Sequence, residues 1–155
     1  MQVAKILTEE EQLVLRNKAK AELERLETEL LDLETKKMID NYKEKFSLCE
    51  IVYKIFFDEH QFKKTGKHPQ RMQIKMTQVP HALNFAGYTY DKNLLTNLFG
   101  GEDRVGKRTV KKLRDALTHS MSKSAVEELR GREQELHGYM DEFLNVIKNF
   151  DNQAT

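Results

Sequence analysis

The sequence is poor in residues that cross-link or interrupt a chain. Its 155 residues include one cysteine, Cys49, and two prolines. A single cysteine excludes an intrachain disulfide and a cysteine-ligated zinc site. Neither glycine nor proline occurs before Gly66. Because these two residues are the strongest helix breakers, their absence favours helix throughout the region before Gly66.

The sequence also lacks long apolar runs and a large excess of either charge. The opening residues, MQVAKILTEE, contain no apolar stretch of signal-peptide length, and no run approaches the roughly 18 apolar residues of a membrane span. We therefore expect a cytoplasmic protein in a reducing compartment, with no membrane contact. Lys and Arg number 26 against 25 Asp and Glu, which argues against a generally polycationic nucleic-acid binder.

The length and the pattern of apolar residues predict one all-α domain. A chain of 155 residues has the size of a single domain, and we expect residues 1–155 to form it, with residues 1–7 and 151–155 frayed. Thr8 and Glu11 have the spacing of a capping box, which predicts the start of the first helix. We expect the chain to fold as a bundle of five or six helices, of which the N- and C-terminal helices are long. Further helices are predicted for residues 41–64, 78–87, 92–99, 109–118 and 124–150.

Four leucines in the first predicted helix recur at heptad spacing. They are Leu23, Leu26, Leu30 and Leu33, and Glu and Lys flank them. Two interpretations stay open: a surface helix lying on its own core, or a seam that pairs with another helix.

Three of the later predicted helices have a candidate apolar face. Cys49 is interpreted as a small buried hydrophobe within one of them. Ser124 and Glu127 have capping-box spacing and predict the start of the last helix. The residues predicted to face inward are Leu48, Ile51, Val52, Ile55 and Phe56; Val110, Leu113 and Leu117; and Leu129, Leu136, Met140, Phe143 and Ile147.

Most recognisable site motifs are absent. The sequence contains no phosphate-binding GxxxxGK[ST], no GxGxxG, no HExxH, no CxxC and no GxSxG. His60 and His68 lie near a predicted helix end without a third metal ligand in view. We therefore expect no metal and no cofactor.

One segment, RVGKRTVKKLRDALTHS, carries a local positive charge. Six of the eleven residues from Arg104 to Arg114 are basic and none is acidic. A solvated helix face is one interpretation of such a run. The other is a phosphate-binding edge, because Lys and Arg supply most nucleic-acid affinity through backbone phosphates. In that case the residues that steer an RNA strand are Lys107, Arg108, Lys111 and Lys112.

The same segment contains an arginine, an aspartate and a histidine. Asp115 and His119 are four residues apart and share a helix face, so the carboxylate is placed to orient the imidazole. Arg114 and His119 are offset by about 140° on an ideal helix. They converge only if the helix ends at His119, which the following Ser-Met-Ser suggests, or if a second copy of the segment supplies the missing groups. The sequence leaves open whether Glu50, Asp58 and Glu59 approach this site, and we interpret them as solvated side chains.

The segment LRDALTHS, followed by a long amphipathic helix, resembles the HEPN superfamily. Arg114, a polar residue at 115 and His119 match that family's Arg-polar-x3-His motif. The resemblance implies an all-helical, metal-independent endoribonuclease that dimerises to build a composite site. Family members commonly act as toxins or defence effectors, and others are inactive partners or nucleotide-binding modules.

The resemblance also implies roles for individual residues. His119 is expected to act as general acid or base, Arg114 to hold the scissile phosphate, and Asp115 to orient His119. Thr118 and Ser120 are expected to add hydrogen bonds. Arg132 and His137 have the same spacing, but we set this second match aside because it lies within a helix and among acidic residues.

A different function class stays open. The chain is alternatively a non-catalytic interaction or regulatory module, an adaptor or antitoxin-like protein, that uses residues 23–33 and the last helix to bind a partner. A nucleotide-binding module without turnover is a further alternative. The partners expected are RNA or a nucleotide, a second copy of the chain, and a cognate antitoxin or effector protein.

Overall fold

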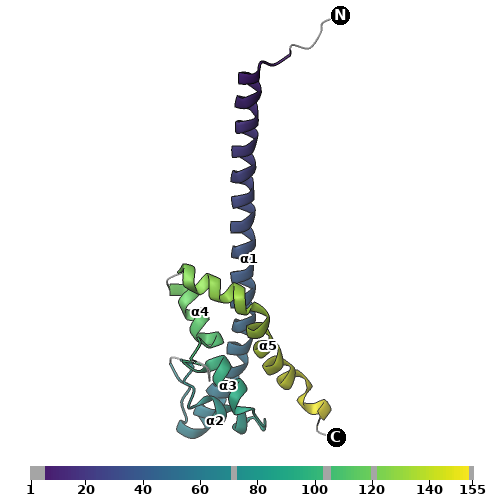
Figure 1. Ribbon diagram of the computed structural model, residues 1–155. Helices are drawn as coiled ribbons and strands as arrows, with labels where there is room; N and C mark the ends of the chain where they lie inside the picture. Colours follow the sequence, from purple (N-terminus) through teal and green to yellow (C-terminus); the bar gives the residue numbers. More distant parts are fainter. Residues whose placement is uncertain (1–5, 71–72, 103–105, 120–121, 154–155) are drawn as a thin grey trace, which may run out of the picture. The chain divides into compact units, whose positions relative to one another are not determined.

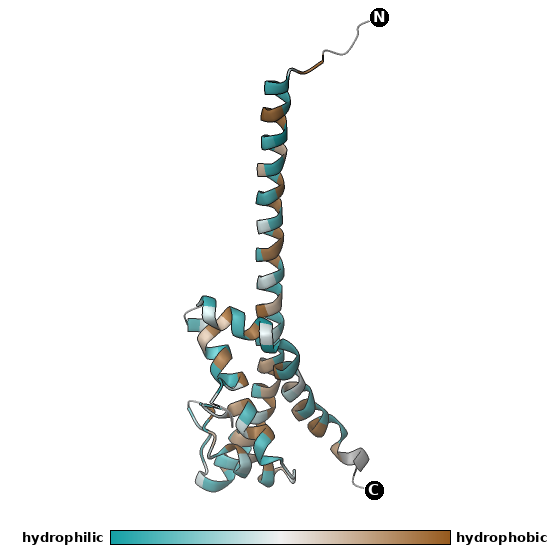
Figure 2. Cartoon of the chain, in the orientation of Figure 1, coloured by the Kyte–Doolittle hydropathy of each residue, from teal (hydrophilic) through white to brown (hydrophobic). Residues whose placement is uncertain are grey.

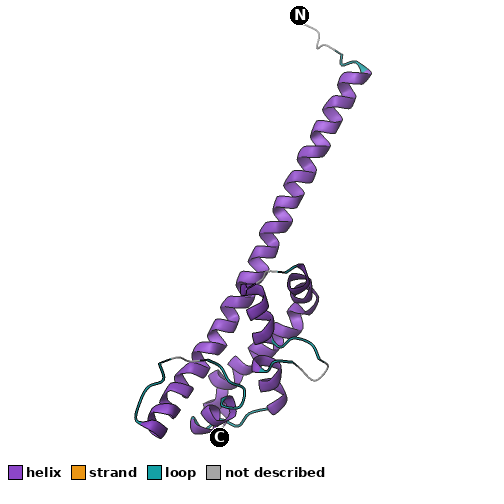
Figure 3. Cartoon of the chain, turned by 90° about the vertical axis from the view of Figure 1, so that its left-hand side faces the viewer, coloured by secondary structure: helices purple, strands orange, loops and turns teal. Residues whose placement is uncertain are grey.

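The computed structural model describes residues 6–70, 73–102, 106–119 and 122–153, and Figures 1 and 3 show helices and loops in these ranges and no strand. The prediction of an all-α protein is therefore confirmed. The helices are α1 (Glu9–Thr65), α2 (Val79–Phe85), α3 (Lys92–Phe99), α4 (Val110–His119) and α5 (Lys123–Gln153).

Helix α1 begins where the sequence predicts and then continues further than predicted. The Thr8 hydroxyl accepts a hydrogen bond from the Glu11 amide, and the Glu11 carboxylate accepts one from the Thr8 amide, both at 3.2 Å. The prediction of a separate second helix from residue 41 is wrong, because α1 runs without a break through residues 34–41. That stretch, ETKKMIDN, contains neither glycine nor proline to end a helix.

The chain divides into two compact units, Met1–Met38 and Ile39–Thr155. In the first unit the described side chains from Ile6 to Glu34 are all exposed. Figure 2 shows apolar residues distributed along this part of α1 among hydrophilic ones. The prediction that residues 1–155 form one domain stays a prediction. Of the predicted frayed ends, residues 1–5 and 154–155 lie outside the described residues, and α5 is helical to Gln153.

The second unit has a core in which α1 contributes an aromatic face. Its ring contacts include Phe46 with Phe99 and Tyr53 with Phe99, at centroid distances of 6.1 and 5.9 Å. The apolar face predicted for this part of α1 is wrong at Leu48, Ile51 and Ile55, which are more than half exposed. The other two predicted residues, Val52 and Phe56, are half-buried. Two apolar stripes run along this part of α1, and the stripe that is richer in aromatic residues is buried. The buried residues of α1 are Ile39, Tyr42, Phe46, Cys49, Tyr53 and Phe57.

The predicted inward faces of α4 and α5 are largely confirmed. Val110, Leu113 and Leu117 are buried, as are Leu129, Leu136, Met140 and Phe143, while Ile147 is half-buried. The predicted capping box at the start of the last helix is wrong by two residues. Helix α5 begins at Lys123, and the Ser122 hydroxyl caps it by accepting a hydrogen bond from the Ala125 amide at 3.2 Å.

Candidate functional site

The candidate site is built on α4, whose start is anchored to two other parts of the second unit. Thr109 is buried, and its hydroxyl donates to the Gly100 carbonyl and accepts a hydrogen bond from the Lys112 amide. The hydroxyl of Tyr42 on α1 donates to the Val110 carbonyl at 2.6 Å. Burial raises the pKa of Tyr42, which keeps the phenol protonated as a donor. These bonds fix where α4 lies against α1.

Arg114 reaches from α4 to α1. Its Nε donates to Asp115 Oδ1 at 2.9 Å, and both of its terminal nitrogens lie 3.3 Å from Glu50 Oε2. The guanidinium carbon lies 4.6 Å from the centre of the buried Phe46 ring. Only 21% of the Arg114 side chain is exposed. Two carboxylates and a ring therefore fix the guanidinium at the edge of the core.

Two lysines complete the charges around Arg114. Lys111 Nζ lies 3.4 Å from Asp115 Oδ2, and Lys54 Nζ lies 3.4 Å from Glu50 Oε1. We call these five residues the Arg114 cluster; three are cations and two are carboxylates, so its formal charge is +1. The interpretation of Glu50 as a solvated residue is wrong, because its side chain is 21% exposed and paired. Sequence reasoning missed Lys54, and no motif marks it.

The predicted partners of His119 lie elsewhere. His119 is exposed and is the last residue of α4, as the sequence predicts. Asp115, expected to orient it, directs its oxygens to Arg114 and Lys111. Thr118 donates to the Arg114 carbonyl at 2.9 Å, which is a bond within its own helix. Ser120 lies outside the described residues.

The predicted RNA-steering residues are only partly available to a ligand. Arg108 lies 3.8 Å from Glu128 of α5, and Lys111 is paired with Asp115. Lys107 is exposed and contributes to lowering the pKa of Glu135, for which a hydrogen bond from Tyr139 is the main cause. Lys112 is exposed, and its ammonium has no hydrogen-bond or ion-pair partner within the described ranges.

The second Arg–His match lies inside α5, as the sequence predicts. Arg132 is held by Glu128 and Glu135, each at 3.0 Å, and donates to the Arg108 carbonyl at 2.8 Å. His137 is half-buried with its ring edge-on to Tyr42, 5.9 Å between centroids. Burial lowers the pKa of His137. This arginine and histidine therefore have structural contacts.

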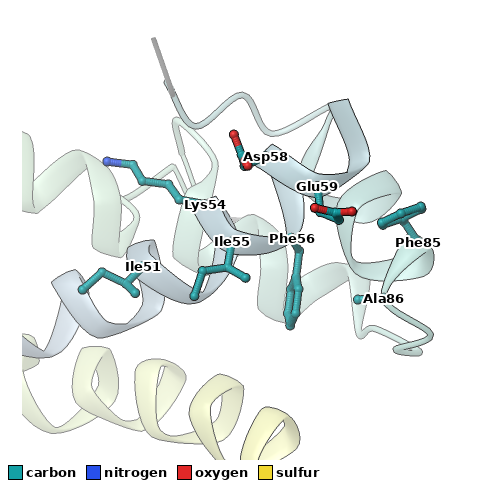
Figure 4. A pocket seen from close by; sticks show the side chains of 8 residues that line it. All are labelled: Ile51, Lys54, Ile55, Phe56, Asp58, Glu59, Phe85 and Ala86. Carbon is teal, nitrogen blue, oxygen red and sulfur yellow. The ribbon is translucent and has the colours of Figure 1, made fainter. Parts of the chain in front are cut away.

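A groove of about 710 Å³ is lined by residues of α1 and of the C-terminal end of α2 (Figure 4). Its apolar part includes Ile51, Ile55 and Phe85, which are 55, 60 and 44% exposed. Lys54, which pairs with Glu50, also lines it. No group of three or more His, Cys, Asp and Glu in the described parts of the chain is placed to bind a metal ion.

Comparisons with protein-family models, with curated proteins and with solved structures find no match to this chain. Among the described helices, none combines the length and apolar character that crossing a bilayer requires. The HEPN resemblance therefore rests on the segment that contains Arg114, Asp115 and His119.

Proposed function

We propose that the chain is a metal-independent endoribonuclease of the HEPN type, with a site that a second copy completes. One observation carries the proposal. The Arg114 guanidinium is held in place by Asp115, Glu50 and Phe46, on a helix whose last residue is the exposed His119. A fixed planar cation and an accessible imidazole are the two groups that metal-free cleavage of a phosphodiester requires.

The proposed reaction begins with the RNA 2′-OH attacking the adjacent phosphorus. His119 takes the hydroxyl proton, the 2′-O–P bond forms and the P–O5′ bond breaks. The leaving 5′ oxygen receives a proton from the second imidazole or from water. Arg114 donates to the phosphate oxygens as charge builds on them in the transition state. The products are a 2′,3′-cyclic phosphate and a 5′-OH end.

The geometry of α4 is the reason for proposing two copies. Because Arg114 and His119 are five residues apart, they are offset by about 140° around the helix. One copy therefore directs the two side chains to different sides of α4. Two copies related by a two-fold axis offer two arginines and two histidines, so that each phosphate meets a pair drawn from both chains.

The charge of the Arg114 cluster supports the same arrangement. Glu50 and Asp115 cancel two of its three positive charges, which weakens the attraction of a single copy for an anion. Two copies of the cluster raise the formal charge around one phosphate from +1 to +2. The biological role that accompanies this activity is that of a cytoplasmic toxin or defence effector, controlled by a cognate protein.

The test is RNA cleavage in the presence of EDTA. Wild-type protein should cleave RNA to fragments with 2′,3′-cyclic phosphate ends, while His119→Ala and Arg114→Ala should lose at least a hundredfold in rate. His81→Ala is the matched control, because His81 is also an exposed helical histidine. Equal cleavage by wild type, His119→Ala and Arg114→Ala would identify a contaminating nuclease and refute the proposal.

A second candidate function has its own support. Arg108, Lys111 and Arg114 all make ion pairs within the chain, as structural residues do, and the leucines of the first unit are exposed. These features favour a non-catalytic interaction module. Saturable binding of RNA or a nucleotide without cleavage, unchanged in His119→Ala, would support this second function over the nuclease.

A further inference from the structure

The first unit presents four leucines to solvent on one side of α1. Leu23, Leu26, Leu30 and Leu33 are 56, 49, 57 and 64% exposed. Their spacing of three, four and three residues places them at the a and d positions of two heptads. Such a row is the pattern that a second helix covers, since exposing it to water is unfavourable.

Charged residues border this leucine seam in a definite order. On one edge the flanking positions hold Glu22, Glu29 and Lys36, and on the other edge they hold Lys20, Glu27 and Glu34. Each edge therefore has two glutamates and one lysine, with the lysines at opposite ends of the seam. This order decides which helix direction the seam accepts.

A parallel pairing of two copies is unfavourable. In a parallel pair, the residue directly before Leu23 or Leu30 on one chain faces the residue five positions later in the sequence of the other chain. Glu22 then meets Glu27 of the second copy, and Glu29 meets Glu34. Symmetry repeats both contacts, so all four are repulsive.

An antiparallel pairing reverses this outcome. Leu23 then packs on Leu33 of the second copy and Leu26 on Leu30. Lys20 meets Glu34, Glu22 meets Lys36, and symmetry makes each of these attractive contacts twice. Only Glu27 and Glu29 meet their own counterparts, and Arg25, which pairs with Glu29 at 2.6 Å, moderates the second of these contacts.

We propose that residues 20–36 form an antiparallel helix pair with the same residues of a second copy of this chain. The interface is isologous, with the two-fold axis passing beside residue 28. This inference rests on the first unit alone. Its interface is separate from the second-unit contact that the proposed nuclease needs, so sedimentation without RNA tests the leucine seam and RNA cleavage tests the nuclease site.

Paired charge reversals test the proposal by sedimentation velocity of the full chain. Wild type should show a concentration-dependent dimer. The variant K20E/K36E makes both edges wholly acidic, and E22K/E34K places lysine opposite lysine in the antiparallel pair; each alone should be monomeric. An equimolar mixture should restore a dimer, because every reversed contact then joins Lys to Glu.

Two further observations make the test decisive. E24K/D32K changes the net charge as E22K/E34K does, but at helix positions outside the seam, and should leave the dimer intact. A parallel pair predicts the opposite result for E22K/E34K, since the lysine introduced at position 22 would then attract Glu27 and that variant would dimerise alone. A monomeric wild type, a dimer of either seam variant alone, or a mixture that stays monomeric would each overturn the proposal.

Discussion

The contact between Glu50 and Arg114 should make a measurable contribution to the stability of the second unit. Both side chains are 21% exposed, and two guanidinium nitrogens share one carboxylate oxygen at 3.3 Å. At an effective dielectric constant of about 20, two unit charges at this distance attract by about 5 kcal/mol. Desolvation and competition from Asp115 and Lys54 offset most of that attraction. We expect a net coupling of about 1–2 kcal/mol, between the values typical of exposed and buried pairs.

A double-mutant cycle measures this coupling. Glu50→Gln and Arg114→Met are suitable single changes, because the first keeps the shape of the side chain and the second keeps a stem over Phe46. Urea unfolding of wild type, both single variants and the double variant gives the free energy of unfolding of each. The pair Lys45–Asp141, 2.9 Å apart and with Asp141 53% exposed, lies outside the leucine seam and serves as control; it should show a smaller coupling, because water screens an exposed charge. A Glu50–Arg114 coupling below about 0.3 kcal/mol would refute the reasoning that this pair fixes Arg114.

Three other predictions concern the core of the second unit. Burial lowers the pKa of His137 below 6.5, so the unfolded chain binds the proton more readily than the folded chain. The free energy of unfolding should therefore fall as the pH drops below 6.5. The difference between the urea midpoints at pH 5 and pH 8 should be smaller for His137→Gln than for wild type. Burial raises the pKa of the Cys49 thiol to about 12, so a thiol reagent at pH 8 should react only after unfolding, and rapid reaction of the native protein would contradict this. Tyr42→Phe removes the 2.6 Å bond to the Val110 carbonyl and should lower the free energy of unfolding by about 1 kcal/mol; an unchanged urea midpoint would count against that bond.

Local signals in the sequence predicted much of the helical structure. The Thr8–Glu11 capping box depends only on residues three positions apart, and it forms as predicted. The helix predicted for residues 92–99 matches α3, and Gly100 follows it directly. The predicted division of α1 failed for a related reason: it was placed in a stretch without a breaking residue, and a helix with no local reason to end continues.

The choice of buried face on α1 could not be made from spacing alone. Leu48, Ile51 and Ile55 recur at helical intervals, and so do Tyr42, Phe46 and Tyr53. Which stripe is buried depends on what the other helices offer, here Phe99 of α3 and the Val110 carbonyl of α4. Tyrosine satisfies its hydroxyl in such a setting, so its polar atom does not prevent burial.

The basic segment shows why a run of cations in a sequence does not establish a basic surface. Arg114 finds its carboxylate at Glu50, 64 positions earlier, and Arg108 finds one at Glu128 on the next helix. No inspection of residues 104–120 reveals either partner. Under the proposed function, a phosphate that binds at Arg114 must either displace Glu50 or meet cationic groups from two chains, because Glu50 and Asp115 cancel much of the nearby charge. Displacing Glu50 costs the free energy of its coupling to Arg114, whereas binding between two chains leaves that pair intact. For this reason we expect the proposed cleavage to depend on protein concentration.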